Sequence, residues 1–115
     1  MLKRGYTVFA VVHGSQPKFT IPECVADLNR AVRYIRAHAA DFHIDPNRIG
    51  VSGASAGGHL SLMLGTTQDE GDPKSKDEVL GTGCKVAAVV ALFPPTDLRK
   101  IVTDPPDIIK NNAAL

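Results

Sequence analysis

The sequence contains no tryptophan and few residues of the kinds that build disulfide frameworks or metal sites. It has two cysteines, two methionines and 5% aromatic residues. Cys24 and Cys84 lie far apart in the chain and form no closely spaced metal-binding pair, so we interpret both as reduced, buried thiols. The cysteine pattern therefore indicates no metal site.

The chain also lacks a strong charge imbalance and any long apolar run. A formal net charge of +1 gives no reason to expect nucleic acid or an acidic surface as a partner. No run approaches the roughly 18 apolar residues of a membrane-spanning helix, and the charged start at 1–4 is not followed by a signal-peptide pattern. With 43% hydrophobic residues in 115 positions, the sequence predicts one globular domain without a nucleic-acid or membrane partner.

Short apolar runs alternate with helical patterns along the chain. Residues 6–12, 49–52 and 85–93 have strand length, and the first run is apolar almost throughout, as in a strand covered on both faces. A helical pattern follows each run, and Pro94 stops the third run. This order predicts an α/β fold in which helices flank a parallel sheet.

The first helix carries a start signal and one apolar stripe. Thr20 is the predicted N-cap, with Glu23 completing a capping box and Pro22 in the first turn. The residues behind it recur at spacings of three and four and predict one buried stripe, made of Val25, Leu28, Val32, Ile35, Ala39 and Phe42. The charged residues beside this stripe are interpreted as a solvated face: Asp27, Arg30, Arg33 and Arg36.

The connections and the later helices are also readable from turn and cap residues. Residues 45–48 predict a proline turn, and residues 66–83 predict an exposed connection with a short turn at 77–80. A second helix is predicted over 56–64, ended by Gly65. Thr96 is expected to cap a last short helix, which Pro105 and Pro106 interrupt.

Ser55 lies between a predicted strand and a predicted helix, within the run GASAG. An abrupt strand-to-helix corner strains its central residue, and Gly53 and Gly57 supply the small size that such a corner needs. The corner would present the Ser55 hydroxyl at the start of the helix, where the Ala56 N–H can stabilise an oxyanion. G-x-S-x-G in this context predicts a serine nucleophile at a nucleophile elbow. A tight strand–helix turn of the same shape, without catalytic function, is the alternative.

Three stretches of the sequence resemble the central part of an α/β-hydrolase: RGYTVFAV, IDPNRIGVSGASAGGHL and AAVVALFPPTDL. They are similar to the branch that contains carboxylesterases, acetyl-xylan and feruloyl esterase-like enzymes and hormone-sensitive-lipase relatives. The resemblance implies a serine hydrolase that acts on small-molecule carboxylic esters through an acyl-enzyme at Ser55. It also implies that the Ala56 N–H is an oxyanion-hole donor, and that no metal or organic cofactor takes part.

The family's triad runs in the order Ser, then Asp or Glu, then His, and here the match is incomplete. No histidine follows His59, which we interpret as a helix-packing residue rather than the base. Asp97 follows the third apolar run and is a candidate acid, with helix N-capping as the alternative. His13 precedes Gly14 in a run that mimics an oxyanion loop, so a direct site role and an ordinary loop position both stay open.

The resemblance therefore implies that residues 1–115 form a single partial domain. We expect it to lack the strand that carries the oxyanion loop, between 6–12 and 49–52, and the later strands that carry the acid and the histidine. Open strand edges invite pairing, so a chain that folds alone is expected to rearrange its strand order or to form a homodimer. The alternative function is a catalytically incomplete fragment or a self-associating module.

Overall fold

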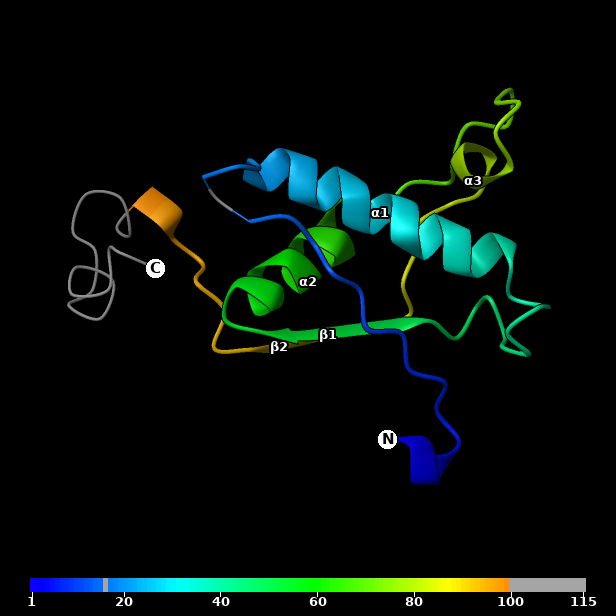
Figure 1. Cartoon of the computed structure of the whole chain (residues 1–115), viewed down its shortest axis with the longest axis horizontal. Helices are drawn as coiled ribbons and strands as arrows, with labels where there is room; N and C mark the ends of the chain where they lie inside the picture. Colours follow the sequence, from blue (N-terminus) through cyan, green and yellow to red (C-terminus); the bar gives the residue numbers. More distant parts are fainter. Residues whose placement is uncertain (16, 100–115) are drawn as a thin grey trace.

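The computed structural model describes residues 1–15 and 17–99, and in these residues helices pack against a two-stranded parallel sheet (Figure 1). The elements follow in the order η1 (Leu2–Arg4), α1 (Ile21–Ala37), β1 (Gly50–Ala54), α2 (Ala56–Thr66), α3 (Glu78–Gly81) and β2 (Ala88–Leu92). The predicted α/β class with parallel strands is confirmed. The described sheet has two strands, however, where the sequence predicts three.

α1 begins where the sequence predicts, and the capping box is present. The Glu23 N–H donates to Thr20 Oγ1 at 3.5 Å, and the Thr20 N–H donates to Glu23 Oε2 at 2.8 Å. The Thr20 backbone N–H, followed by the Thr20 hydroxyl, lowers the pKa of Glu23 below its ordinary 4.5. The apolar stripe of α1 then packs on α2 to form the core, whose buried members are Cys24, Val25, Leu28, Val32, Leu60, Leu64 and Cys84.

The sheet is covered on one face and bare on the other. β1 and β2 pair in parallel with Val51 opposite Val89, and both of these side chains are half-buried on the face against which α2 packs. Figure 1 shows α1 on the same side of the sheet as α2. On the opposite face, Val90 is 55% exposed and Leu92 is 52% exposed. The third apolar run, at 85–93, therefore forms a shorter and more exposed strand than predicted.

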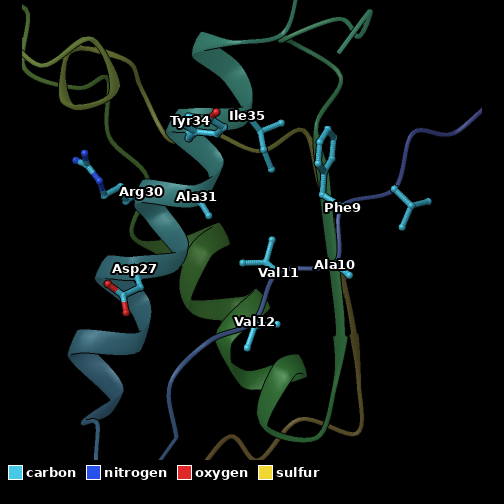
Figure 2. Close-up of a pocket in the computed structure, with 10 residues that line it drawn as sticks. Phe9, Ala10, Val11, Val12, Asp27, Arg30, Ala31, Tyr34 and Ile35 are labelled. Atoms are coloured by element: carbon cyan, nitrogen blue, oxygen red, sulfur yellow. The ribbon is translucent and has the colours of Figure 1, made fainter. Parts of the chain in front are cut away.

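Residues 6–12 do not form the predicted buried strand. They have neither helical nor strand structure, and Val12 is 95% exposed. A strand requires a neighbour that binds its N–H and C=O groups, and the described sheet offers this segment none. A hollow of about 660 Å³ lies between the segment and α1. Figure 2 shows Val11 and Ile35 pointing into this hollow and Arg30 pointing away from it.

Two predicted helix boundaries also differ from the structure. α2 continues through Gly65 and ends at Thr66. Gly65 allows β2 to approach the helix, because a Cβ at this position would lie 2.8 Å from Val89 Cγ2. The predicted turn at 77–80 is the short helix α3, which Asp77 caps by accepting the Val79 N–H at 2.9 Å.

The predicted solvated face is present at Asp27 and Arg30, which are exposed, whereas Arg33 and Arg36 are half-buried. Arg30 binds the Asp77 carboxylate at 3.1 Å, Arg33 binds the Asp69 carboxylate at 2.6 Å, and Arg36 donates to the Lys85 carbonyl. A spacing of three residues places these side chains along one side of the helix, and the segment between α2 and β2 returns along that side. Sequence separations of more than 30 residues hide this pairing from a local pattern.

Candidate active site

Ser55 occupies the corner between β1 and α2, at the carboxyl end of the parallel sheet. Its backbone has φ 52° and ψ −119°, a conformation that costs a non-glycine residue roughly 1–3 kcal/mol. The Ser55 N–H donates to the Leu92 carbonyl at 3.0 Å, and the Ser55 carbonyl accepts the His59 N–H at 3.0 Å. The end of β2 and the first turn of α2 thus hold this residue from both sides, and its side chain is exposed.

The glycines around Ser55 allow the close approach of β1 to α2. A Cβ at Gly53 would lie 2.3 Å from the Gly57 carbonyl oxygen, and a Cβ at Gly58 would lie 2.9 Å from the Leu92 carbonyl oxygen. The steric reason predicted for Gly53 is therefore present. At Gly57 a Cβ would have no atom outside its own helix within 4 Å. The part of Gly57 that lies close to Gly53 is its backbone, so a side chain at position 57 would not add to the crowding.

A cavity of about 210 Å³ opens beside the start of α2. Its wall includes Ala56 and His59 from α2, together with His13 and Gly14 from the segment before α1. The Ala56 N–H is the first of the helix and has no intrahelical acceptor. Ser55 immediately precedes this part of the wall, at the edge of a parallel sheet where ligands commonly bind.

The two histidines of this cavity both have hydrogen bonds with backbone carbonyls. His59 Nδ1 lies 3.0 Å from the Pro95 carbonyl oxygen, and His13 Nδ1 lies 2.5 Å from the Gly14 carbonyl oxygen. The contact of His59 fits its interpretation as a packing residue. Among residues 1–15 and 17–99, no hydrogen bond joins the Ser55 hydroxyl to a histidine. The structure brings His13 close to the start of α2, but its site role stays a prediction.

Asp97 lies just before a helical turn that begins at Leu98. Its Oδ1 accepts the Arg99 N–H at 3.1 Å and the Arg99 Nε–H at 3.0 Å. Asp97, and not the predicted Thr96, therefore has the capping contact. The catalytic role of Asp97 as an acid stays a prediction, and the interruption expected at Pro105 and Pro106 lies outside the described residues.

The remaining predicted features of the site are quickly placed. Cys24 and Cys84 are free and buried, as predicted. In the part of the chain that the structure describes, no group of three or more histidine, cysteine or acidic residues could hold a metal ion. The helices of that same part are too short or too polar to cross a bilayer.

Backbone groups at the corner are what the sequence does not reveal. The carbonyls of Leu92 and Pro95 hold Ser55 and His59 in place. Because every residue type has a carbonyl, no pattern of side chains marks these two positions. Gly53 and Gly58, at which a Cβ would meet backbone atoms of Gly57 and Leu92, were the available signals of a close backbone approach.

Comparison with known proteins places this geometry in a family. The chain matches the BD-FAE family model over residues 1–114. It is 29% identical over 97 residues to the probable carboxylic ester hydrolase LipM of Mycobacterium tuberculosis (strain ATCC 25618 / H37Rv). The matched region covers 84% of this chain and 22% of LipM. It is 40% identical over 68 residues to an acetylxylan esterase of Xylanibacter ruminicola, which covers 56% of this chain and 13% of that enzyme.

Solved structures show the same similarity in three dimensions. An acetyl ester-xyloside bifunctional hydrolase from Caldicellulosiruptor lactoaceticus superposes with a TM-score of 0.73 at 39% identity, over 77% of this chain and 32% of that protein. A truncated carbohydrate esterase from gut microbiota gives a TM-score of 0.69 at 36% identity, over 82% of this chain and 36% of that protein. The chain thus spans about a fifth of LipM and about a third of these structures. The match over 1–114 shows that this chain belongs to the BD-FAE family, with an α/β-hydrolase type of fold.

Proposed function

We propose that this chain carries the nucleophile of a serine hydrolase that cleaves carboxylic esters. The observation that supports the proposal most strongly is the exposed Ser55 at a strained strand-to-helix corner, with φ 52°. Strain at a residue held from both sides is typical of functional sites, and a strained strand-to-helix corner is the backbone geometry that a nucleophile elbow requires. Relatives named as esterases and carboxylic ester hydrolases support the same reaction class.

The proposed chemistry proceeds through an acyl-enzyme. Ser55 Oγ attacks the ester carbonyl carbon as its proton passes to a base, and the carbonyl oxygen becomes an oxyanion. The Ala56 N–H, at the start of α2, donates a hydrogen bond to that oxyanion. The alcohol leaves with a proton, and water then cleaves the acyl-serine bond to release the acid.

We propose that the base and most of the remaining domain come from polypeptide outside these residues. His59 and His13 each have a ring nitrogen bonded to a carbonyl and neither binds the Ser55 hydroxyl in the described part of the chain. The relatives are also several times longer than this chain. On this proposal, residues 1–15 and 17–99 are part of a larger domain, whose further strands would pair beside β1 and β2.

A fluorophosphonate probe tests whether the chain is active by itself. The probe phosphonylates an activated serine, and hydrolysis of p-nitrophenyl acetate measures turnover. If Ser55 is an activated nucleophile in the isolated chain, both signals appear in the wild type and disappear in Ser55→Ala. If the wild type is not labelled although circular dichroism shows it folded, the isolated chain is not a catalyst.

A self-associating module is the second candidate, and the bare sheet face favours it. Val90, Leu92 and Phe93 are 55%, 52% and 77% exposed, whereas parallel sheets are normally covered on both faces. Light scattering should then show a dimer that dissociates in Val90→Lys. Leu80→Lys is the matched control, because Leu80 is 45% exposed but lies in α3 rather than on the sheet. A wild-type monomer at high concentration would exclude self-association.

A further inference from the structure

The segment between α2 and β2 is tied to α1 along its length. We name residues 67–85 the strap. The Arg33 Nη2 binds both oxygens of the Asp69 carboxylate, at 2.7 and 2.6 Å, and the Arg33 Nη1 donates to the Thr82 carbonyl at 2.5 Å. One guanidinium therefore joins the first and last parts of the strap to the helix. The side chain of Arg33 is 12% exposed and that of Asp69 is 54% exposed, so water reaches the carboxylate but has little access to the guanidinium.

Cys84 is itself part of the strap and lies two residues after Thr82. It is 0% exposed, and its N–H donates to the Asp69 carbonyl at 3.0 Å. The Asp69 N–H in turn lies 3.3 Å from the Cys84 sulfur. Asp69 thus binds Arg33 through its carboxylate and hydrogen-bonds with Cys84 through its backbone.

We propose that the Arg33–Asp69 attachment is a gate on the chemical accessibility of Cys84. A reagent can reach the buried sulfur only when the strap leaves α1, and that local opening breaks the charged hydrogen bonds of Arg33. Local opening of this kind occurs without unfolding of the whole domain. The side-chain hydrogen bond from Arg33, with a smaller contribution from the Gly71 N–H, lowers the pKa of Asp69 below its ordinary 3.8. The lowered pKa means that Arg33 stabilises the ionised form of Asp69.

The chain contains its own reference thiol and its own reference arginine. Cys24 is 5% exposed and lines the cavity beside α2, and its sulfur lies 3.1 Å from the Gly14 carbonyl oxygen rather than next to the strap. Arg30 also binds the strap, through Asp77, yet both side chains of this pair are exposed, at 54% and 39%. Exposed pairs contribute little, so loss of Arg30 should barely open the strap.

The test is the rate at which N-ethylmaleimide labels each cysteine, followed by mass spectrometry of the two peptides. The thiolate sulfur adds to one carbon of the maleimide double bond, and the other carbon takes a proton from water. With fast opening and closing, the labelling rate follows the open population. Arg33→Ala should label Cys84 at least roughly tenfold faster, since it removes hydrogen bonds to a charged group. Arg30→Ala should stay within about twofold of the wild type, and Cys24 should not change.

Three results would overturn the gate. The first is an unchanged labelling rate of Cys84 in Arg33→Ala. The second is an equal rise in the labelling rate of Cys24, which would mean that the whole fold has loosened. The third is a rise in the Cys84 rate in Arg30→Ala as large as that in Arg33→Ala. Asp69→Asn keeps the backbone contacts to Cys84 and removes only the charge, so it decides the matter if Arg33→Ala does not fold. Cys84 in Asp69→Asn should label faster than in the wild type, and an unchanged rate there contradicts the proposal.

Discussion

Gly53 and Gly57 look equivalent in the sequence but should respond in opposite ways to substitution by alanine. A Cβ at Gly53 would lie 2.3 Å from the Gly57 carbonyl oxygen and 2.4 Å from the Gly57 carbonyl carbon. Both are backbone atoms, so no flexible side chain can move aside. A Cβ at Gly57 would have no atom outside its own helix within 4 Å.

The magnitude follows from these distances. Overpacking costs about 1–3 kcal/mol, and the backbone contacts place Gly53→Ala near the upper end of that range, because β1 and α2 must separate. Gly57→Ala lies within α2, where alanine is favoured over glycine by up to about 1 kcal/mol. The two variants should therefore differ by roughly 3–4 kcal/mol in the free energy of unfolding, with Gly53→Ala the less stable.

The assay is thermal and urea unfolding of both variants, followed by circular dichroism at 222 nm. At roughly 4 °C per kcal/mol for a domain of this size, the midpoints should lie more than about 10 °C apart. Equal midpoints, or a lower midpoint for Gly57→Ala, would refute the steric account of the corner. The urea slope should stay the same in both variants, since neither exposes a new part of the fold.

Three further predictions concern the corner, the helix start and acid. Ser55→Gly should stabilise the chain by about 1 kcal/mol in urea unfolding, because glycine adopts positive φ without the strain that Ser55 bears, and Ser55→Ala should not. Thr20→Ala should destabilise the chain by only about 0.5–1 kcal/mol, because the Glu23 N–H lies a full 3.5 Å from the hydroxyl; a loss above about 2 kcal/mol would contradict this weak cap. The pKa values of Asp69 and Asp77 in the folded chain are lowered from 3.8, chiefly by hydrogen bonds from Arg33 and Arg30. The two carboxylates therefore contribute fully to the free energy of unfolding above about pH 4, and this contribution is lost as the pH falls through their pKa values in the folded chain. Urea unfolding between pH 7 and 2.5 should show this loss, and the free energy of unfolding should fall less steeply with pH in Asp69→Asn than in the wild type.

Local chemistry explains the parts of the fold that were predictable. The capping box at Thr20 and Glu23 involves two residues three positions apart, and short-range sterics dictate the strained turn at Ser55. The spacing of apolar residues identified Val25, Leu28 and Val32 as buried. The cap and the turn involve neighbours in the chain, so the pattern carries the whole interaction; for the apolar stripe the spacing shows which side of the helix is buried but not what covers it.

The errors arose where a partner lies far away in the sequence. Residues 6–12 have the composition of a buried strand, but composition cannot supply the neighbouring strand that would pair with them. The charges of Arg30 and Arg33 suggested a solvated face, because their partners Asp77 and Asp69 lie in the strap, far away in the sequence. Gly65 was expected to end a helix and instead accommodates Val89.

By itself the sequence determined the start of α1, the two parallel strands at 49–52 and 85–93, and a serine at the corner with small residues around it. The tertiary structure decided that the Leu92 and Pro95 carbonyls hold that corner, that Arg33 attaches the strap that carries Cys84, and that one sheet face is exposed among the described residues. The physical reason is range. Capping and backbone strain act within a few residues, whereas strand pairing, burial and ion pairs depend on groups that only folding brings together.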